Sequence, residues 1–210
     1  MFASRPATDR RTRSTVRAVL IVANVAVIGV FVHQLLAQST YPAVSSSASS
    51  TSASSSASAL GTADGAMPAG VTVFDDQVPG VINLDTDLLL ALRKAATAAK
   101  DDGVRFFVNS GWRSPAYQEH LLREAITKYG SKEEAARWVA TPTTSPHVAG
   151  RAVDLGRSDA TTWLSKHGAK YGLCQIYANE PWHYELRPDA VVNGCPPMYA
   201  DPTHDPRMQQ

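Results

Sequence analysis

The sequence predicts an α+β domain in which helices flank a small antiparallel sheet, preceded by a transmembrane helix and a disordered linker. Helix-like and strand-like segments follow one another without the regular alternation that a parallel sheet requires. A long apolar run lies near the amino terminus, and a stretch of serine and alanine separates it from the rest of the chain. The expected parts are a basic cytoplasmic tail, a transmembrane anchor, a linker, the α+β domain and a carboxyl-terminal tail, at 1–17, 18–37, 38–69, 70–200 and 201–210.

The amino-terminal part has the composition of a membrane anchor. Residues 1–17 contain five arginines and a single acidic residue, Asp9. The apolar run over 18–37 has about the 20 residues that a helix needs to cross a bilayer. Basic residues before a span favour a cytoplasmic amino terminus, so we expect a single-pass protein of the cytoplasmic membrane with an extracellular domain. A cleaved signal peptide is the alternative and would give a secreted protein, but "LLAQST" matches a cleavage site poorly.

The composition of the linker, the net charge and the two cysteines indicate the order of the linker, the class of ligand and the redox compartment. Within the linker at 38–69, the Ser/Ala run at 43–59 holds too little apolar surface to offset the entropy of ordering, which predicts a disordered tether. The formal net charge of +1 gives no indication of nucleic-acid binding. Cys174 and Cys195 both lie in the exported part, where oxidising conditions favour a disulfide between them. Two free thiols are the alternative.

Local patterns predict each element of the domain. Leucines and alanines recur at helical spacing in the first helix, and apolar residues alternate in the first strand. Ser114 and Pro115 begin the next helix, which Gly130 ends. Ser131 and Glu134 form a capping-box pattern at the start of a further helix. The helices are expected at 83–103, 114–130, 131–138 and 159–172, and the strands at 104–111, 151–155, 173–178 and 182–186.

The stretch "SPHVAGRAVD" carries two candidate metal ligands. Pro146 and Gly150 exclude a continuous helix, so a turn followed by a strand is expected to bring His147 and Asp154 together. Apolar residues flank Asp154, and burial of its charge is costly unless a cation compensates for it. Spacing alone also allows a polar turn between two core strands.

The stretch "NEPWHYEL" adds a third ligand and a base. His183 completes a His/Asp/His set, which would leave one position of a tetrahedral zinc ion open. Glu180, three residues earlier, has the placement of a general base that is not itself a ligand. Trp182 is expected to wall the site, although a core tryptophan fits equally well. Three further histidines are interpreted as surface or packing residues: His120, His167 and His204.

At these residues the sequence resembles the D-alanyl-D-alanine carboxypeptidases of the VanY type, zinc peptidases that trim peptidoglycan stems. "SPHVAGRAVDLG" is similar to their S-x-H-x-x-G-x-A-x-D motif, and "EPWHYEL" to their E-x-W-H motif. "NSGWRSPAYQ" is similar to their S-G-aromatic-R-S segment. The three motifs stand in the family's order between Leu84 and Leu186.

The resemblance implies a zinc-dependent enzyme that removes the terminal D-alanine from stem peptides ending in D-Ala-D-Ala. The implied site residues are the zinc ligands His147, Asp154 and His183, the base Glu180, the oxyanion and substrate-binding residue Arg113, and Ser145 and Gln118 near the substrate. "YGLCQIY" departs from the family's G-F-x-x-R-Y pattern and leaves the substrate preference open. The alternatives are a peptidoglycan endopeptidase of the same fold and a zinc-bearing binding module without turnover.

Overall fold

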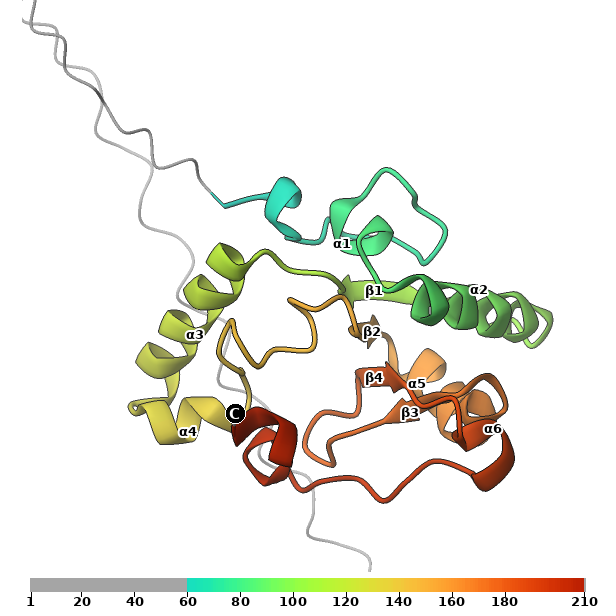
Figure 1. Ribbon diagram of the computed structural model, residues 1–210. Coiled ribbons are helices and arrows are strands. Elements are labelled where there is room, and N and C mark those ends of the chain that lie inside the picture. The colour runs from blue at the N-terminus through green and yellow to red at the C-terminus, as the bar shows by residue number, and fades with distance from the viewer. Residues whose placement is uncertain (1–59, 210) are drawn as a thin grey trace, which may run out of the picture. The chain divides into compact units, whose positions relative to one another are not determined.

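A computed structural model describes residues 60–209 of the chain (Figure 1). The predicted tail at 1–17 and the predicted transmembrane anchor at 18–37 lie outside the described residues. Within the described residues, every helix is too short or too polar to cross a membrane.

A four-stranded antiparallel sheet in the order β1-β2-β4-β3 lies at the centre of the domain. In β2 and β4, Asp154 pairs with His183 and Ala152 pairs with Glu185. Because paired residues of an antiparallel sheet point to the same face, Asp154, His183 and Glu185 share one face. The strands are β1 (Phe107–Ser110), β2 (Ala152–Gly156), β3 (Leu173–Gln175) and β4 (His183–Leu186).

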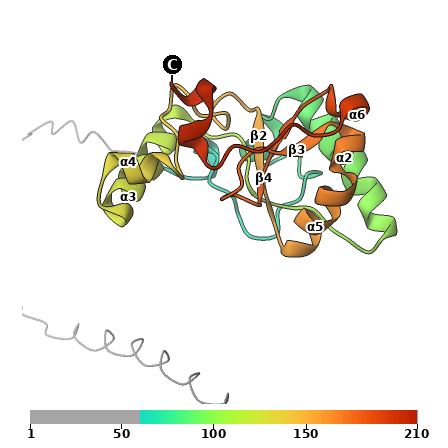
Figure 2. The same ribbon diagram turned by 90° about the horizontal axis from the view of Figure 1, so that it is seen from below.

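The opposite face of the sheet holds the hydrophobic core. Val153, Leu155 and Tyr184 point to this face and join one buried cluster with residues of α2 (Thr86–Asp101) and α5 (Ser158–His167). In Figures 1 and 2, α2 and α5 lie on one side of the sheet and α3 (Pro115–Tyr129) and α4 (Lys132–Ala136) on the other. The sheet thus separates an apolar core from a polar face that carries the candidate ligands.

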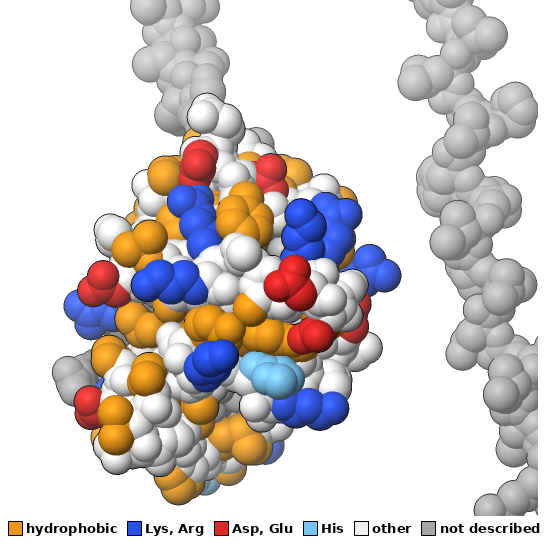
Figure 3. All heavy atoms as spheres, turned by 90° about the vertical axis from the view of Figure 1, so that its right-hand side faces the viewer, with side chains coloured by type: hydrophobic (Ala, Val, Ile, Leu, Met, Phe, Trp, Pro, Cys, Tyr) orange, Lys and Arg blue, Asp and Glu red, His pale blue; other side chains and the backbone are white. Residues whose placement is uncertain are grey.

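The outer face beside α2 and α5 carries charges of both signs. Figure 3 shows Lys and Arg side chains interspersed there with Asp and Glu and with small hydrophobic areas.

The shorter elements of the domain are α1 (Pro79–Ile82) and α6 (Ala190–Asn193), with 3-10 turns at Thr62–Asp64, Gly168–Tyr171, Pro202–His204 and Pro206–Gln209.

The helix starts follow their predicted N-caps, but Glu134 pairs with Arg137 and does not complete the predicted capping box. The Ser114 hydroxyl accepts a hydrogen bond from the Tyr117 amide, and the Ser131 hydroxyl accepts one from the Glu134 amide. The helix expected over 159–172 instead ends at His167 and continues as a 3-10 turn. At Gly168 the backbone passes so close to the Leu173 carbonyl that a Cβ would lie 2.5 Å from its oxygen.

The folded domain is longer than the predicted 70–200. A 3-10 turn forms at Thr62–Asp64, and Asp64 accepts hydrogen bonds from the amide and the hydroxyl of Ser114. At the other end, Asp201 and Asp205 are buried. Polar contacts with residues far away in the sequence hold both extensions. Composition and apolar periodicity do not predict such contacts.

Candidate metal centre

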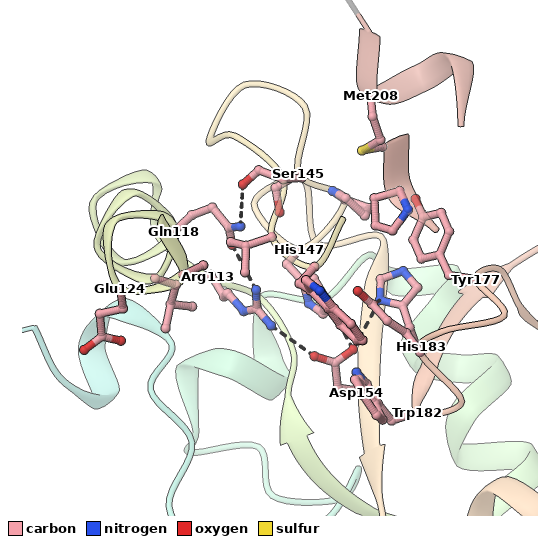
Figure 4. A pocket seen from close by; sticks show the side chains of 18 of the residues that line it. Arg113, Gln118, Glu124, Ser145, His147, Asp154, Tyr177, Trp182, His183 and Met208 are labelled. Carbon is pink, nitrogen blue, oxygen red and sulfur yellow. Dashed lines mark hydrogen bonds and ion pairs between the residues drawn. The ribbon is translucent and has the colours of Figure 1, made fainter. Parts of the chain in front are cut away.

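Three side chains converge on one point of the polar face of the sheet. His147 Nε2 lies 3.4 Å from Asp154 Oδ1, and His183 Nδ1 lies 3.2 Å from the same oxygen. One donor atom from each of the three residues lies within 4.8 Å of the others, and all three residues are buried. Figure 4 shows the two imidazole rings and the carboxylate directed toward one another.

The local fold explains this convergence. Asp154 and His183 are direct partners in the β2–β4 register, so their side chains leave the sheet side by side. His147 comes from the turn before β2, where Gly150 has φ +69° and its carbonyl accepts a hydrogen bond from the Asp85 amide. A side chain at Gly150 would meet the Asn83 carbonyl oxygen at 2.7 Å, which explains the glycine.

Hydrogen bonds on the far side of each ring set its tautomer. His147 Nδ1 lies 2.8 Å from the Gly111 carbonyl oxygen, which can only accept, so Nδ1 donates and Nε2 presents a lone pair to Asp154. His183 Nε2 lies 3.3 Å from Glu185 Oε1, which leaves Nδ1 toward Asp154 in the same way. Two nitrogen lone pairs and a carboxylate oxygen therefore face one another, an arrangement that requires a cation or a proton between them. The residues fit a zinc ion by donor type and by number.

The close packing of these groups shifts their pKa values. Burial opposes the ionised form of Asp154, but the contacts with His147, His183 and Arg113 hold its pKa well below the usual range. Burial also opposes the protonated form of His183, but its hydrogen bonds to Asp154 and Glu185 raise its pKa to about 9. Burial lowers the pKa of His147. The site thus stabilises one positive charge beside Asp154, and a metal cation would take the place of that proton.

Glu180 lies next to the three ligands but outside their group. Its Oε2 is 3.7 Å from His183 Nδ1, and the residue is buried. Burial, opposed by the charge of His183, raises the pKa of Glu180 to about 7. A carboxyl group with a pKa near neutral can both accept and release a proton.

Arg113 binds Asp154 directly, which the sequence did not indicate. Its Nη2 donates to Asp154 Oδ2 at 3.0 Å, its Nη1 to Gln118 Oε1 at 3.0 Å and its Nε to Ser110 Oγ at 2.7 Å. Gln118 is 1% exposed, and its Nε2 donates to the Ala140 carbonyl at 2.8 Å. Gln118 therefore holds the guanidinium of Arg113 in place. The predicted contact of Gln118 with the substrate stays a prediction.

A pocket of about 430 Å³ opens onto the cluster. Arg113, Glu180 and Trp182 line it, and Trp182 remains 38% exposed, as a wall residue and not a core one. Ser145 also lines the pocket, is buried, and has no hydrogen-bond partner for its hydroxyl among residues 60–209. Met208, from the carboxyl-terminal end, stands over the same pocket in Figure 4.

The three other histidines among residues 60–209 lie apart from the centre, in agreement with their interpretation as surface or packing residues. His120 pairs with Glu124 at 3.3 Å on α3, and His167 packs against the Trp163 ring at 4.6 Å between centroids. His204 is exposed and contacts Asp201.

Two neighbours of the centre were missed. Glu185 lies two residues after His183 on the same face of β4, so strand alternation around a ligand was a usable signal. Tyr177, whose ring centroid lies 5.1 Å from that of His183, had no comparable signal in the sequence.

Comparisons with known proteins agree with the motifs. A family model described as VanY, D-alanyl-D-alanine carboxypeptidase, matches residues 81–189. The chain is 29% identical over 143 residues to a D-alanyl-D-alanine carboxypeptidase of Enterococcus faecalis, covering 56% of this chain and 53% of that protein. The chain thus spans about half the length of this curated relative.

Solved structures with similarity to this chain include two carboxypeptidases. VanYB in complex with D-alanine-D-alanine is 27% identical, with a TM-score of 0.49, covering 53% of this chain and 74% of that one. The LdcB LD-carboxypeptidase is 23% identical, with a TM-score of 0.50, covering 62% of this chain and 72% of that one, and it shares the fold. The family match extends over about half of the chain and includes all three candidate ligands and Glu180. The chain belongs to the VanY family of D-alanyl-D-alanine carboxypeptidases.

Proposed function

We propose that this chain is a zinc-dependent D,D-carboxypeptidase that removes the terminal D-alanine from peptidoglycan stem peptides ending in D-Ala-D-Ala. The observation that carries the proposal is the convergence of His147, Asp154 and His183 within 4.8 Å at a pocket, with Glu180 beside them. Two imidazole nitrogens and one carboxylate oxygen form a zinc donor set that leaves a position open for chemistry. Membership of the VanY family supports the substrate class.

The side chains around the ligands have complementary roles. A bound zinc ion would supply Lewis acidity, which polarises the scissile carbonyl and makes an attacking water molecule more acidic. Glu180 accepts the proton of that water and passes it to the departing amine of D-alanine. Arg113 has five N–H donors, of which three bond Ser110, Gln118 and Asp154, so others remain for the carbonyl oxygen as its negative charge develops.

The pocket provides contacts for the peptide. Ser145 offers a buried hydroxyl with no described partner, and we assign it a hydrogen bond to the substrate. Gln118 acts on the substrate through Arg113, whose guanidinium it holds. Trp182 covers one side of the pocket and limits access of water.

Product masses separate this function from its alternatives. The full chain, loaded with zinc, is incubated with a pentapeptide stem that ends in D-Ala-D-Ala, and the products are analysed by mass spectrometry. Loss of a single D-alanine is the expected result. Two peptide fragments, from a cut inside the stem or cross-bridge, would identify an endopeptidase. An intact peptide that nevertheless binds to the protein would identify a binding module.

We also propose that the domain acts outside the cytoplasmic membrane, tethered through 18–37. The five arginines that precede the apolar run support the orientation. The disulfide between Cys174 and Cys195 supports an oxidising compartment. Fractionation of the native cells should find the chain in the membrane with its amino-terminal segment intact. A soluble secreted form that begins near Gln38 would instead establish a cleaved signal peptide.

A further inference from the structure

The carboxyl segment, defined as residues 195–209, folds back onto the metal centre although it lies outside the family match at 81–189. The disulfide joins its first residue, Cys195, to Cys174 in β3. Further along, the Tyr199 amide donates to the Ile176 carbonyl, and the Tyr199 carbonyl accepts from the Ala178 amide. Figure 1 shows this dark red segment returning past the end of the sheet toward α4.

Arg207 of this segment binds a buried carboxylate behind the candidate ligands. Its Nη1 lies 2.7 Å from Glu185 Oε2, and its Nη2 lies 3.2 Å from Glu185 Oε1. Glu185 is 1% exposed, and its only other arginine partner among residues 60–209 is Arg187, at 2.8 Å. A buried carboxylate of this kind needs its partners in place, and Arg207, which contacts both of its oxygens, helps to fix the orientation of Glu185.

Glu185 in turn contacts His183. Its Oε1 lies 3.3 Å from His183 Nε2, on the side of the ring opposite Asp154. A ligating histidine commonly donates its second N–H to a carboxylate, which fixes the tautomer and the direction of the ring. Glu185 can do this only while its own carboxylate is held.

A second contact of His183 depends on the same segment. The ring of Tyr177 lies against that of His183, and the Tyr177 hydroxyl donates to Asp205 Oδ2 at 3.0 Å. Asp205 is also bound by Arg207, through Nε at 3.0 Å. The edge of the His183 ring and one of its faces are therefore both supported by the carboxyl segment.

We propose that Arg207 is a positioning residue of the metal centre. Through Glu185, Arg207 fixes His183 so that Nδ1 presents a lone pair toward Asp154. The carboxyl segment thereby helps to position a metal ligand. This inference rests on the proposed zinc function. Loss of the carboxylate that a ligating histidine contacts typically weakens metal binding about 10–100-fold.

The test measures zinc affinity and not turnover. The full chain and its Arg207→Met variant are stripped of metal, and their zinc dissociation constants are measured by competition with a chromophoric chelator. We expect the variant to bind zinc about 10-fold more weakly than the parent, at the lower end of that range, because Glu185 and its contact with Arg187 remain. The visible absorption of the cobalt(II)-substituted variant should also shift, because the ligand field at His183 changes. A purely structural role would lower the melting temperature and leave this spectrum unchanged.

Arg137→Met is the matched control. Arg137 binds the same carboxyl segment, through Asp201 at 3.0 Å, but has no contact with Glu185. The two arginines are similarly exposed, at 48% and 40% for Arg137 and Arg207. The control should bind zinc as tightly as the parent. Equal weakening in both variants, or none in Arg207→Met, would overturn the inference.

Two further outcomes are distinguishable. If Arg207→Met does not fold, Arg207→Lys carries the test, because lysine keeps the charge but lacks the fork that binds both carboxylate oxygens. Zinc binding by Arg207→Lys as tight as that of the parent would then refute the positioning role. A parent that binds no zinc would instead overturn the proposed function, and this inference with it.

Discussion

At the scale of single residues, Arg113 both lines the pocket and bonds Asp154. Residue type and motif indicated His147, Asp154 and His183 as candidate ligands, because few other residue types bind zinc. The hydrogen bond from Arg113 to Asp154 joins residues 41 positions apart, and no local pattern encodes it. Arg113 therefore stands both at the pocket and behind a ligand.

Because Arg113 contacts both the pocket and Asp154, we expect the Arg113→Ala substitution to have two effects. Turnover of a D-Ala-D-Ala peptide should fall by about 10²-fold or more, because an oxyanion donor is lost. Zinc affinity should fall about 10–100-fold as well, because Asp154 loses a partner that holds its carboxylate. Both quantities can be measured on one preparation. Unchanged zinc affinity would show that Arg113 acts on the substrate alone.

At the scale of elements, helix starts followed from the sequence more closely than strand ends. Ser114 and Ser131 cap the helices that they were expected to cap, because a cap is a contact within four residues. The strand expected over 173–178 is only Leu173–Gln175, since strand length depends on the partner strand. The register that sets Asp154 opposite His183 is likewise a property of two strands, and neither sequence alone specifies it.

The turn before β2 should tolerate no side chain at Gly150. In Gly150→Ala the backbone at φ +69° is unfavourable for alanine, and the new methyl group meets the Asn83 carbonyl oxygen. The two effects together should lower the free energy of unfolding by about 2–4 kcal/mol. Gly103→Ala is the control, with φ +75° but nothing within 4 Å of the added Cβ, and should cost only about 1 kcal/mol. Urea unfolding compares them, and equal losses would contradict the close-contact explanation.

At the scale of the whole molecule, the carboxyl segment packs onto the rest of the domain, although its residues 201–209 fall within the tail predicted at 201–210. The buried side chains of Asp201 and Asp205 bind Arg137, Tyr177 and Arg207 across the domain. Charged residues near a chain end are typical of a solvated tail, and only the tertiary partners distinguish the two cases. The sequence therefore predicts the central elements of the domain but not the packing of the carboxyl segment against them.

This packing should make stability depend on pH in the acid range. Burial opposes ionisation of Asp201, but hydrogen bonds from Thr203, His204 and Arg137 lower its pKa to about 2. Because this folded-state pKa lies below the unfolded value of about 3.9, Asp201 stabilises the fold above pH about 4. That contribution is lost as the pH falls toward 2.

Asp201→Asn removes the charge and should lower the free energy of unfolding at pH 7 by about 1–3 kcal/mol. The gap between variant and parent should narrow as the pH falls from about 4 toward 2. Urea unfolding at several pH values measures it, with the exposed Glu133→Gln as the control. A gap that stays constant down to the lowest pH would rule out this carboxylate as its source.

The most direct test of the zinc peptidase account is a paired measurement on Glu180→Gln. The substitution keeps the shape of the side chain and removes its capacity to accept a proton, while His147, Asp154 and His183 stay unchanged. Zinc content, measured by elemental analysis of the full chain, should remain near that of the parent. Release of D-alanine from a D-Ala-D-Ala peptide should fall about 10²–10⁴-fold, the typical contribution of a general base. Loss of zinc would make Glu180 a ligand, and unchanged turnover would contradict its role as the base.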